Sequence, residues 1–151
     1  MYHIGSAMSL WQLVESELGH IFCTLVGPFT AANAVYNSVM NLNIRLDMVN
    51  AALQARVTDA DILAEWGTLC RSIKTKSETR NKIAHFTVII DSRKNGEAVL
   101  VPNPIRIEEF LRSINGKGSK HGWKDVELFG EAFNDLRHAL QVFCHRLSSS
   151  L

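Results

Sequence analysis

The chain has 151 residues, of which 46% are hydrophobic and 21% are charged, close to the averages of soluble globular domains. This length suits one domain that buries about 70% of the surface of its unfolded form, and the composition excludes intrinsic disorder and a fibrous repeat. Sixteen lysines and arginines against fifteen aspartates and glutamates give a formal charge of +1, which excludes the overall basicity of a histone-like nucleic-acid binder.

Apolar residues at three- and four-residue steps predict two long helices in the first part of the chain. The first covers residues 10–25 and ends at Gly27-Pro28, because this pair stops a helix. The second begins at Thr30, whose hydroxyl is suited to cap a helix, and continues to about Arg56. Its predicted inward face consists of Ala31, Val35, Ser38, Leu42, Leu46, Val49 and Leu53.

A third helix is predicted from Thr58-Asp59 to about His85, and the pattern changes period after it. Residues 87–90 and 98–101 are apolar and rich in β-branched side chains, which is typical of strands. Asn95-Gly96 between them is the strongest short signal of a tight antiparallel turn. We therefore expect one β-hairpin after the third helix.

The remaining chain closes the predicted bundle. Pro102 and Pro104 end the hairpin, residues 107–114 form a short helix, and residues 115–123 form a glycine-containing basic loop. Apolar residues at helical spacing over residues 126–147 predict the last long helix. The predicted fold is mainly α: one domain over residues 1–151, an antiparallel bundle of four long helices plus a short helix, with one inserted β-hairpin.

Two charged residues occupy positions where the helical pattern requires apolar ones. Arg80 lies seven residues beyond Ile73 on the inward face of the third helix, and Glu17 lies four residues from both Leu13 and Ile21. A buried charge costs several kcal/mol unless it is paired. The two residues therefore form either a structural ion pair or part of a functional site.

Arg80 begins the segment Arg80-Asn81-Lys82-Ile83-Ala84-His85, which falls late in the third helix and just before the predicted hairpin. This segment resembles the Arg-x4-6-His motif of HEPN domains, the higher eukaryote and prokaryote nucleotide-binding family. The order of long helices, a β-branched segment and a closing helix also resembles that family over most of the chain.

These residue types are suited to phosphodiester chemistry. Asn81 and His85 are four residues apart and share a helix face, whereas Arg80 lies about 140° around the helix from His85 and has a long side chain. An imidazole can take the proton of a ribose 2′-hydroxyl, and a guanidinium matches the charge that develops on phosphate oxygens.

The resemblance implies a metal-independent endoribonuclease that leaves a 2′,3′-cyclic phosphate and needs no cofactor. In that family two motifs face each other across a homodimer, which implies that Arg80 and His85 of both copies are catalytic. Asn81 would then orient the site, and Glu17 would tune Arg80. The implied partners are a second copy, RNA, and an antitoxin or a nucleotidyltransferase, in a toxin-antitoxin or antiviral defence role.

An alternative interpretation of Arg80 and His85 stays open. A histidine at a helix C-terminus is favoured by the helix dipole without any further role. Some HEPN-like domains keep the bundle and the motif as dimerisation or nucleotide-binding modules without cleaving RNA. In that reading Arg80 is paired internally with Glu17.

Further positions add weaker expectations. Five lysines are candidates for RNA contact, with a plain solvated surface as the alternative: Lys74, Lys76, Lys82, Lys117 and Lys120. Cys23, Cys70 and Cys144 match neither a disulfide framework nor a zinc site, and the histidines lack the spacing of a metal site. With no secretory leader or membrane-spanning run predicted, we expect a cytoplasmic protein.

Overall fold

A computed structural model of the chain describes residues 2–91, 97–102 and 122–151, with side chains for residues 2–85 and 122–151. The described part is mainly helical, which confirms the predicted fold class at that level. The helices are α1 (Tyr2–Val26), α2 (Phe29–Asn37), α3 (Leu42–Arg56), α4 (Ala60–His85) and α6 (Trp123–Ser150). The strands are β1 (Phe86–Asp91) and β2 (Glu97–Pro102).

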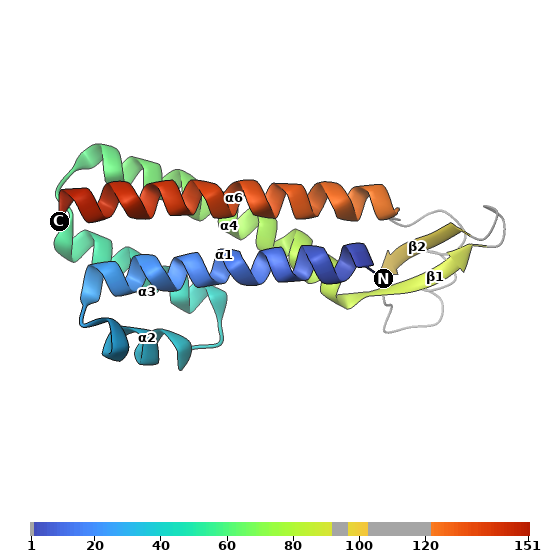
Figure 1. Ribbon diagram of the computed structural model, residues 1–151, viewed down its shortest axis with the longest axis horizontal. Coiled ribbons are helices and arrows are strands. Elements are labelled where there is room, and N and C mark those ends of the chain that lie inside the picture. Colours follow the sequence, from blue (N-terminus) through green and yellow to red (C-terminus); the bar gives the residue numbers. More distant parts are fainter. Residues whose placement is uncertain (1, 92–96, 103–121) are drawn as a thin grey trace.

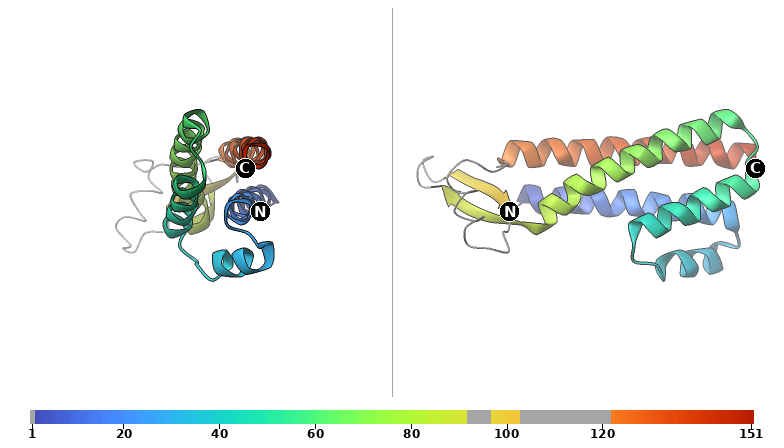
Figure 2. Two further views of the ribbon diagram at one scale, coloured as in Figure 1. Left: turned by 90° about the vertical axis from the view of Figure 1, so that its left-hand side faces the viewer. Right: turned by 180° about the vertical axis from the view of Figure 1, so that it is seen from behind.

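α1 is the central helix of the bundle. α6 lies along one side of α1, and α2 and α3 lie on the opposite side (Figure 1). α4 crosses α1 and α6 at an angle, as the views from the end and from behind show (Figure 2). Four elements therefore surround the middle of α1, and a polar residue on α1 can face any of them.

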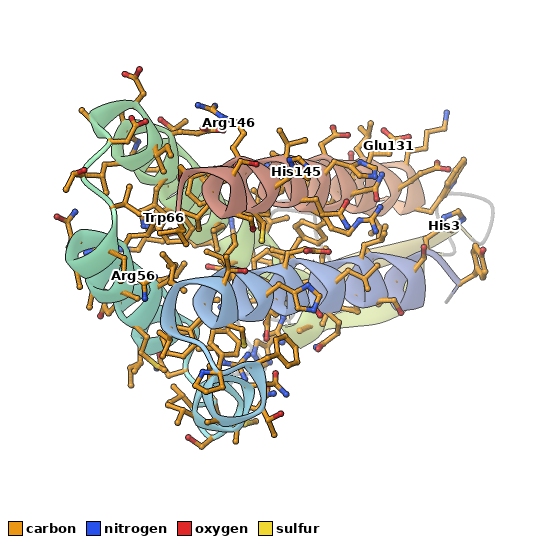
Figure 3. All side chains as sticks on the ribbon, turned by 60° about the vertical axis from the view of Figure 1, so that its left-hand side comes forward. His3, Arg56, Trp66, Glu131, His145 and Arg146 are labelled. Carbon is orange, nitrogen blue, oxygen red and sulfur yellow. The ribbon has the colours of Figure 1, made fainter. Side chains whose placement is uncertain are left out.

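The core consists of large apolar side chains on the facing sides of these helices. Trp11 of α1 meets Phe133 of α6 edge to face, with ring centroids 5.2 Å apart. Trp66 of α4 lies in the interior with its centroid 5.7 Å from that of Phe143 (Figure 3). α1 begins at Tyr2 rather than at residue 10, and the buried Ala7 continues its inward face toward the N-terminus.

The prediction of one helix over residues 30–56 is wrong, because the chain forms two helices there. The side chain of Asn41 accepts hydrogen bonds from the amides of Asn43 and Ile44, and these bonds start α3 as a separate helix. Thr30 lies inside α2, whose N-cap is Pro28.

The predicted inward face of the first of these two helices is also displaced. α2 buries Ala32 and Tyr36, and the predicted inward residue Val35 is 54% exposed. The face predicted for α3 is confirmed, since Leu46, Val49 and Leu53 are buried.

β1 and β2 pair antiparallel, with Thr87 opposite Val101 and Ile90 opposite Ala98. They contain both segments for which the sequence predicts strands. The turn at Asn95-Gly96 lies outside the described residues, so the hairpin as a whole stays a prediction. The short helix at residues 107–114 and most of the basic loop also lie outside them.

None of the described helices is both long enough and apolar enough to cross a membrane.

Candidate functional site

Arg80 and His85 both lie in the last two turns of α4, at the end of the bundle where β1 begins (Figure 1). Ile83 between them is buried, with 3% of its surface exposed, and anchors these turns against the core. Asn81, Lys82 and His85 are exposed. The local sequence thus fixes the helix through one apolar residue and leaves the polar residues around it accessible.

Arg80 is half-buried and lacks a carboxylate partner among the described residues. Its Nη1 donates a hydrogen bond to Oδ1 of Asn81 over 3.0 Å. Its Nε is buried and has no hydrogen-bond partner in the described part of the chain. A guanidinium whose charge no described carboxylate balances is suited to bind an anionic ligand through its accessible N–H groups.

Arg80 and Asn81 line an open cleft of about 610 Å³. α1 forms the floor of this cleft; α2, α3 and the connection between them form one wall, and Ser77, Arg80 and Asn81 of α4 form the other. The split of the predicted second helix into α2 and α3 is what creates this wall, since the connection at residues 38–41 contributes Met40 and Asn41.

Glu15 organises the floor of the cleft. Its carboxylate accepts a hydrogen bond from Nε1 of Trp11 over 2.6 Å and forms an ion pair with Nη1 of Arg45 over 3.0 Å. Arg45 also donates from Nε to the carbonyl of Val39 over 2.6 Å, which ties the connection between α2 and α3 to α3. These contacts hold Arg45 in one place.

Tyr36 completes this cluster from α2. Its hydroxyl donates to the backbone carbonyl of Glu15 over 3.3 Å, and the Arg45 guanidinium lies 4.8 Å from its ring centroid. Burial raises the pKa of Tyr36 well above its ordinary value, Arg45 opposes that shift, and Glu15 and Cys23 add to it. The phenol is therefore neutral in the folded protein at neutral pH.

The expected pairing of Glu17 with Arg80 is wrong. The Glu17 carboxylate accepts a hydrogen bond from Nε2 of Gln141 over 2.8 Å and lies 3.4 Å from Nδ1 of His20. Glu15 and Glu17 are about 200° apart around α1, so Glu17 faces α6 whereas Glu15 faces the cleft. Glu17 therefore does not pair with Arg80, although its neighbour His20 lines the cleft.

The structure brings two of the predicted site residues, Arg80 and Asn81, into the cleft, and it places His85 outside the cleft lining. The imidazole of His85 makes no hydrogen bond or ion pair with the residues that are described. The sequence interpretation missed Glu15 and Arg45. The one signal for Glu15 was its position four residues after Trp11, and Arg45 offered none because its partner lies on another helix.

Three of the five candidate RNA-binding lysines lie among the residues with described side chains, and none of these three lines the cleft. Lys74 and Lys82 are exposed on α4, and Lys76 is half-buried with its Nζ 3.4 Å from Oγ of Ser72. Lys117 and Lys120 lie outside the described residues. Within the described ranges, no three His, Cys, Asp or Glu side chains are grouped so that they could hold a metal ion.

No model of a protein family, no curated protein and no solved structure matches this chain. The function is therefore argued from its own residues.

Proposed function

We propose that this chain is a metal-independent endoribonuclease of the HEPN type, which cleaves RNA at a composite site of a homodimer. The observation that carries the proposal is the state of two side chains near the end of α4. Arg80 has a buried Nε without a partner, and His85 is exposed five residues later without a bond to any described residue. A cation and an imidazole that pair with no carboxylate among the described residues are suited to bind and cleave a phosphodiester.

The chemistry follows from the residue types. An imidazole removes the proton of a ribose 2′-hydroxyl, and the resulting oxygen attacks the adjacent phosphorus. The bond to the 5′-oxygen breaks, a protonated imidazole returns a proton to that oxygen, and a 2′,3′-cyclic phosphate remains. Arg80 stabilises the charge on the phosphate oxygens, and Asn81 holds Arg80 through the 3.0 Å hydrogen bond.

A second copy supplies what one chain lacks. Five residues along a helix separate Arg80 from His85 by about 7.5 Å along the axis and about 140° around it. The motif of one chain contributes one imidazole, that of His85, whereas the reaction uses a base and an acid. A C2 dimer that pairs the ends of two α4 helices provides two histidines and two arginines. A toxin or antiviral effector is the biological role that this activity suits.

The test is incubation of total RNA with purified protein in excess EDTA, followed by gel electrophoresis. We expect wild-type protein to cleave the RNA, and His85→Ala and Arg80→Ala each to lower the rate by about 100-fold or more. His145→Ala is the matched control, since His145 is exposed on the C-terminal part of α6 (Figure 3). The C-terminal end of α6 lies at the opposite end of the bundle from the last turns of α4 (Figure 1). Cleavage that requires magnesium, or that survives in His85→Ala, would contradict the proposal.

A second candidate is a non-catalytic HEPN-like dimerisation or nucleotide-binding module. One observation favours it: Arg80 and Asn81 line the cleft, and His85 does not. In this case Arg80 serves binding alone. The same gel assay separates the two candidates, because a module leaves RNA intact in wild-type and variant protein alike.

A further inference from the structure

Three neighbouring rings form an aromatic cluster where α1 and α6 begin: those of Tyr2, His3 and Trp123. The centroid of the Trp123 ring lies 5.5 Å from that of His3, with an angle of 35° between the planes. The Tyr2 ring meets His3 edge to face at 5.8 Å. His3 lies near the start of α1 (Figure 3). α1 and α6 begin at the end of the bundle that also holds the last turns of α4, with Arg80 and His85 (Figure 1).

The aromatic cluster is open to solvent. Trp123 keeps 45% of its surface exposed, and Tyr2 keeps 84%. The other two tryptophans, Trp11 and Trp66, are only 1% and 2% exposed, because they fill the core. Neighbouring exposed rings keep apolar surface in contact with water, which a ligand with a flat apolar face would cover favourably.

Lys124 adds a positive charge to the aromatic cluster. Its Nζ lies over the Trp123 ring, 5.5 Å from the centroid. Lys124 is exposed and has a flexible stem, so its ammonium can move from the ring to an anion that approaches. An aromatic face beside a lysine matches a single nucleic-acid strand, whose bases present flat π faces and whose phosphates are negative. A duplex matches it poorly, because its bases are stacked within the helix.

We infer that the aromatic cluster is a stacking site for an unpaired base of RNA, with Trp123 as the main contact and Lys124 beside a neighbouring phosphate. The inference rests on the proposed function for the identity of its ligand. It adds a contact with a base, which Arg80 and His85 do not supply because they act on the phosphate and the ribose. A strand held here lies at the same end of the bundle as the last turns of α4 (Figure 1).

The test compares two probes of equal length and charge: a 2′-O-methyl oligouridylate, which the proposed reaction cannot cleave, and the same backbone with abasic residues. Each probe carries the same fluorophore at its 5′ end, and fluorescence anisotropy at low salt gives its dissociation constant. We expect the probe with bases to bind about 5-fold or more tighter, because stacking on an aromatic side chain contributes at least that much per base. Equal binding of the two probes, or binding of neither, would overturn the inference.

Tryptophan fluorescence locates the contact, with the same oligonucleotides lacking the fluorophore. A base that stacks on Trp123 should quench its emission, whereas Trp11 and Trp66 are shielded by their burial. We therefore expect quenching by the oligouridylate and little quenching by the abasic oligomer. Binding of the oligouridylate without quenching would overturn the placement at Trp123.

Two substitutions separate stacking from apolar packing. Trp123→Leu keeps an apolar side chain without a ring, so the oligouridylate should bind about 5-fold or more weakly and the abasic oligomer as before. Trp123→Phe keeps an aromatic face and should retain most of the affinity. Phe29→Leu is the matched control, because Phe29 is 59% exposed on α2. Unchanged affinity in Trp123→Leu, or an equal loss in Phe29→Leu, would overturn the inference.

The outcomes separate this inference from the proposed function. RNA cleavage by wild-type protein, together with equal binding of the two probes, would leave the proposed function intact and overturn the stacking site. Tighter binding of the oligouridylate that is lost in Trp123→Leu, without any RNA cleavage by wild-type protein, would do the reverse.

Discussion

Arg45 connects three parts of the chain through its guanidinium: Glu15 on α1, the carbonyl of Val39, and the ring of Tyr36 on α2. With 11% of its side chain exposed, this ion pair is largely shielded from solvent. Removal of one partner of such a pair leaves a charge that water reaches poorly. The loss of either partner should therefore destabilise the fold, because the remaining charge would be unpaired and poorly hydrated.

We predict that Arg45→Met lowers the free energy of unfolding by about 3 kcal/mol, because it leaves the Glu15 carboxylate without its cation. The matched control is Arg146→Met, whose ion pair with Glu65 is exposed, with side chains 54% and 30% accessible, and should contribute about 0.2–1 kcal/mol. Urea denaturation measures both. An equal effect of the two substitutions would contradict the role assigned to the Glu15 cluster.

Tyr36 should make the free energy of unfolding depend on pH in the alkaline range. Burial raises its pKa in the folded chain, so Tyr36 keeps its proton where the unfolded chain loses it, above the ordinary pKa of about 10. The unfolded chain then binds fewer protons, and the free energy of unfolding decreases as the pH rises. We predict a falling melting temperature between about pH 9 and 11 that is less steep in Tyr36→Phe. Identical slopes in the two proteins would contradict the shift.

The close packing of α1 against α2 depends on Gly19. A Cβ at this position would lie 3.1 Å from Cε1 of the buried Tyr36 ring, which is tighter than ordinary contact. We predict that Gly19→Ala lowers the free energy of unfolding by about 1–3 kcal/mol, because the ring must move. Gly5 in the same helix has no atom within 4 Å of such a Cβ.

Gly5→Ala is therefore the control, and it should stabilise α1 by about 0.5–1 kcal/mol, because alanine loses less backbone entropy in a helix. Thermal melts of the two variants are compared with wild type. Stabilisation by both substitutions would show that α2 does not pack on α1 as described.

Helical periodicity predicts elements well where one face is buried along the whole length. α4 and α6 match their predictions closely, and Arg80, seven residues beyond Ile73 on the predicted inward face, is half-buried and lines the cleft. The break between α2 and α3 escaped this reasoning. Asn41 caps α3 through its side chain, and no proline or glycine marks the break within residues 38–41.

The sequence predicted only those parts of the candidate site that lie close together in the chain. Arg80 and Asn81 are neighbours in sequence, and the motif identified both. The partner of Arg45 lies 30 residues away in sequence, and the partner Gln141 of Glu17 lies 124 residues away. Such pairs depend on how helices pack, which periodicity within one helix does not encode. Glu17 was therefore assigned to the wrong neighbour.

The C-terminal end of α4 lies beside the strands at one end of the bundle. The connection from α3 to α4 lies at the other end (Figure 2). A composite site at the C-terminal end of α4 requires a second copy. We predict a symmetric homodimer by light scattering, with His85→Ala and wild-type protein giving the same mass. A monomer at every concentration at which RNA is cleaved would contradict the composite site and leave the fold unaffected.

Attack by the ribose 2′-hydroxyl, as proposed, leaves a signature in the ends of the RNA fragments. Wild-type protein in EDTA should produce 2′,3′-cyclic phosphate and 5′-hydroxyl ends from a short oligoribonucleotide, and no fragments from the same oligonucleotide with 2′-O-methyl groups. His85→Ala should produce neither end at a comparable rate. Fragments with 3′-hydroxyl and 5′-phosphate ends, or cleavage of the 2′-O-methylated oligonucleotide, would contradict attack by the 2′-hydroxyl.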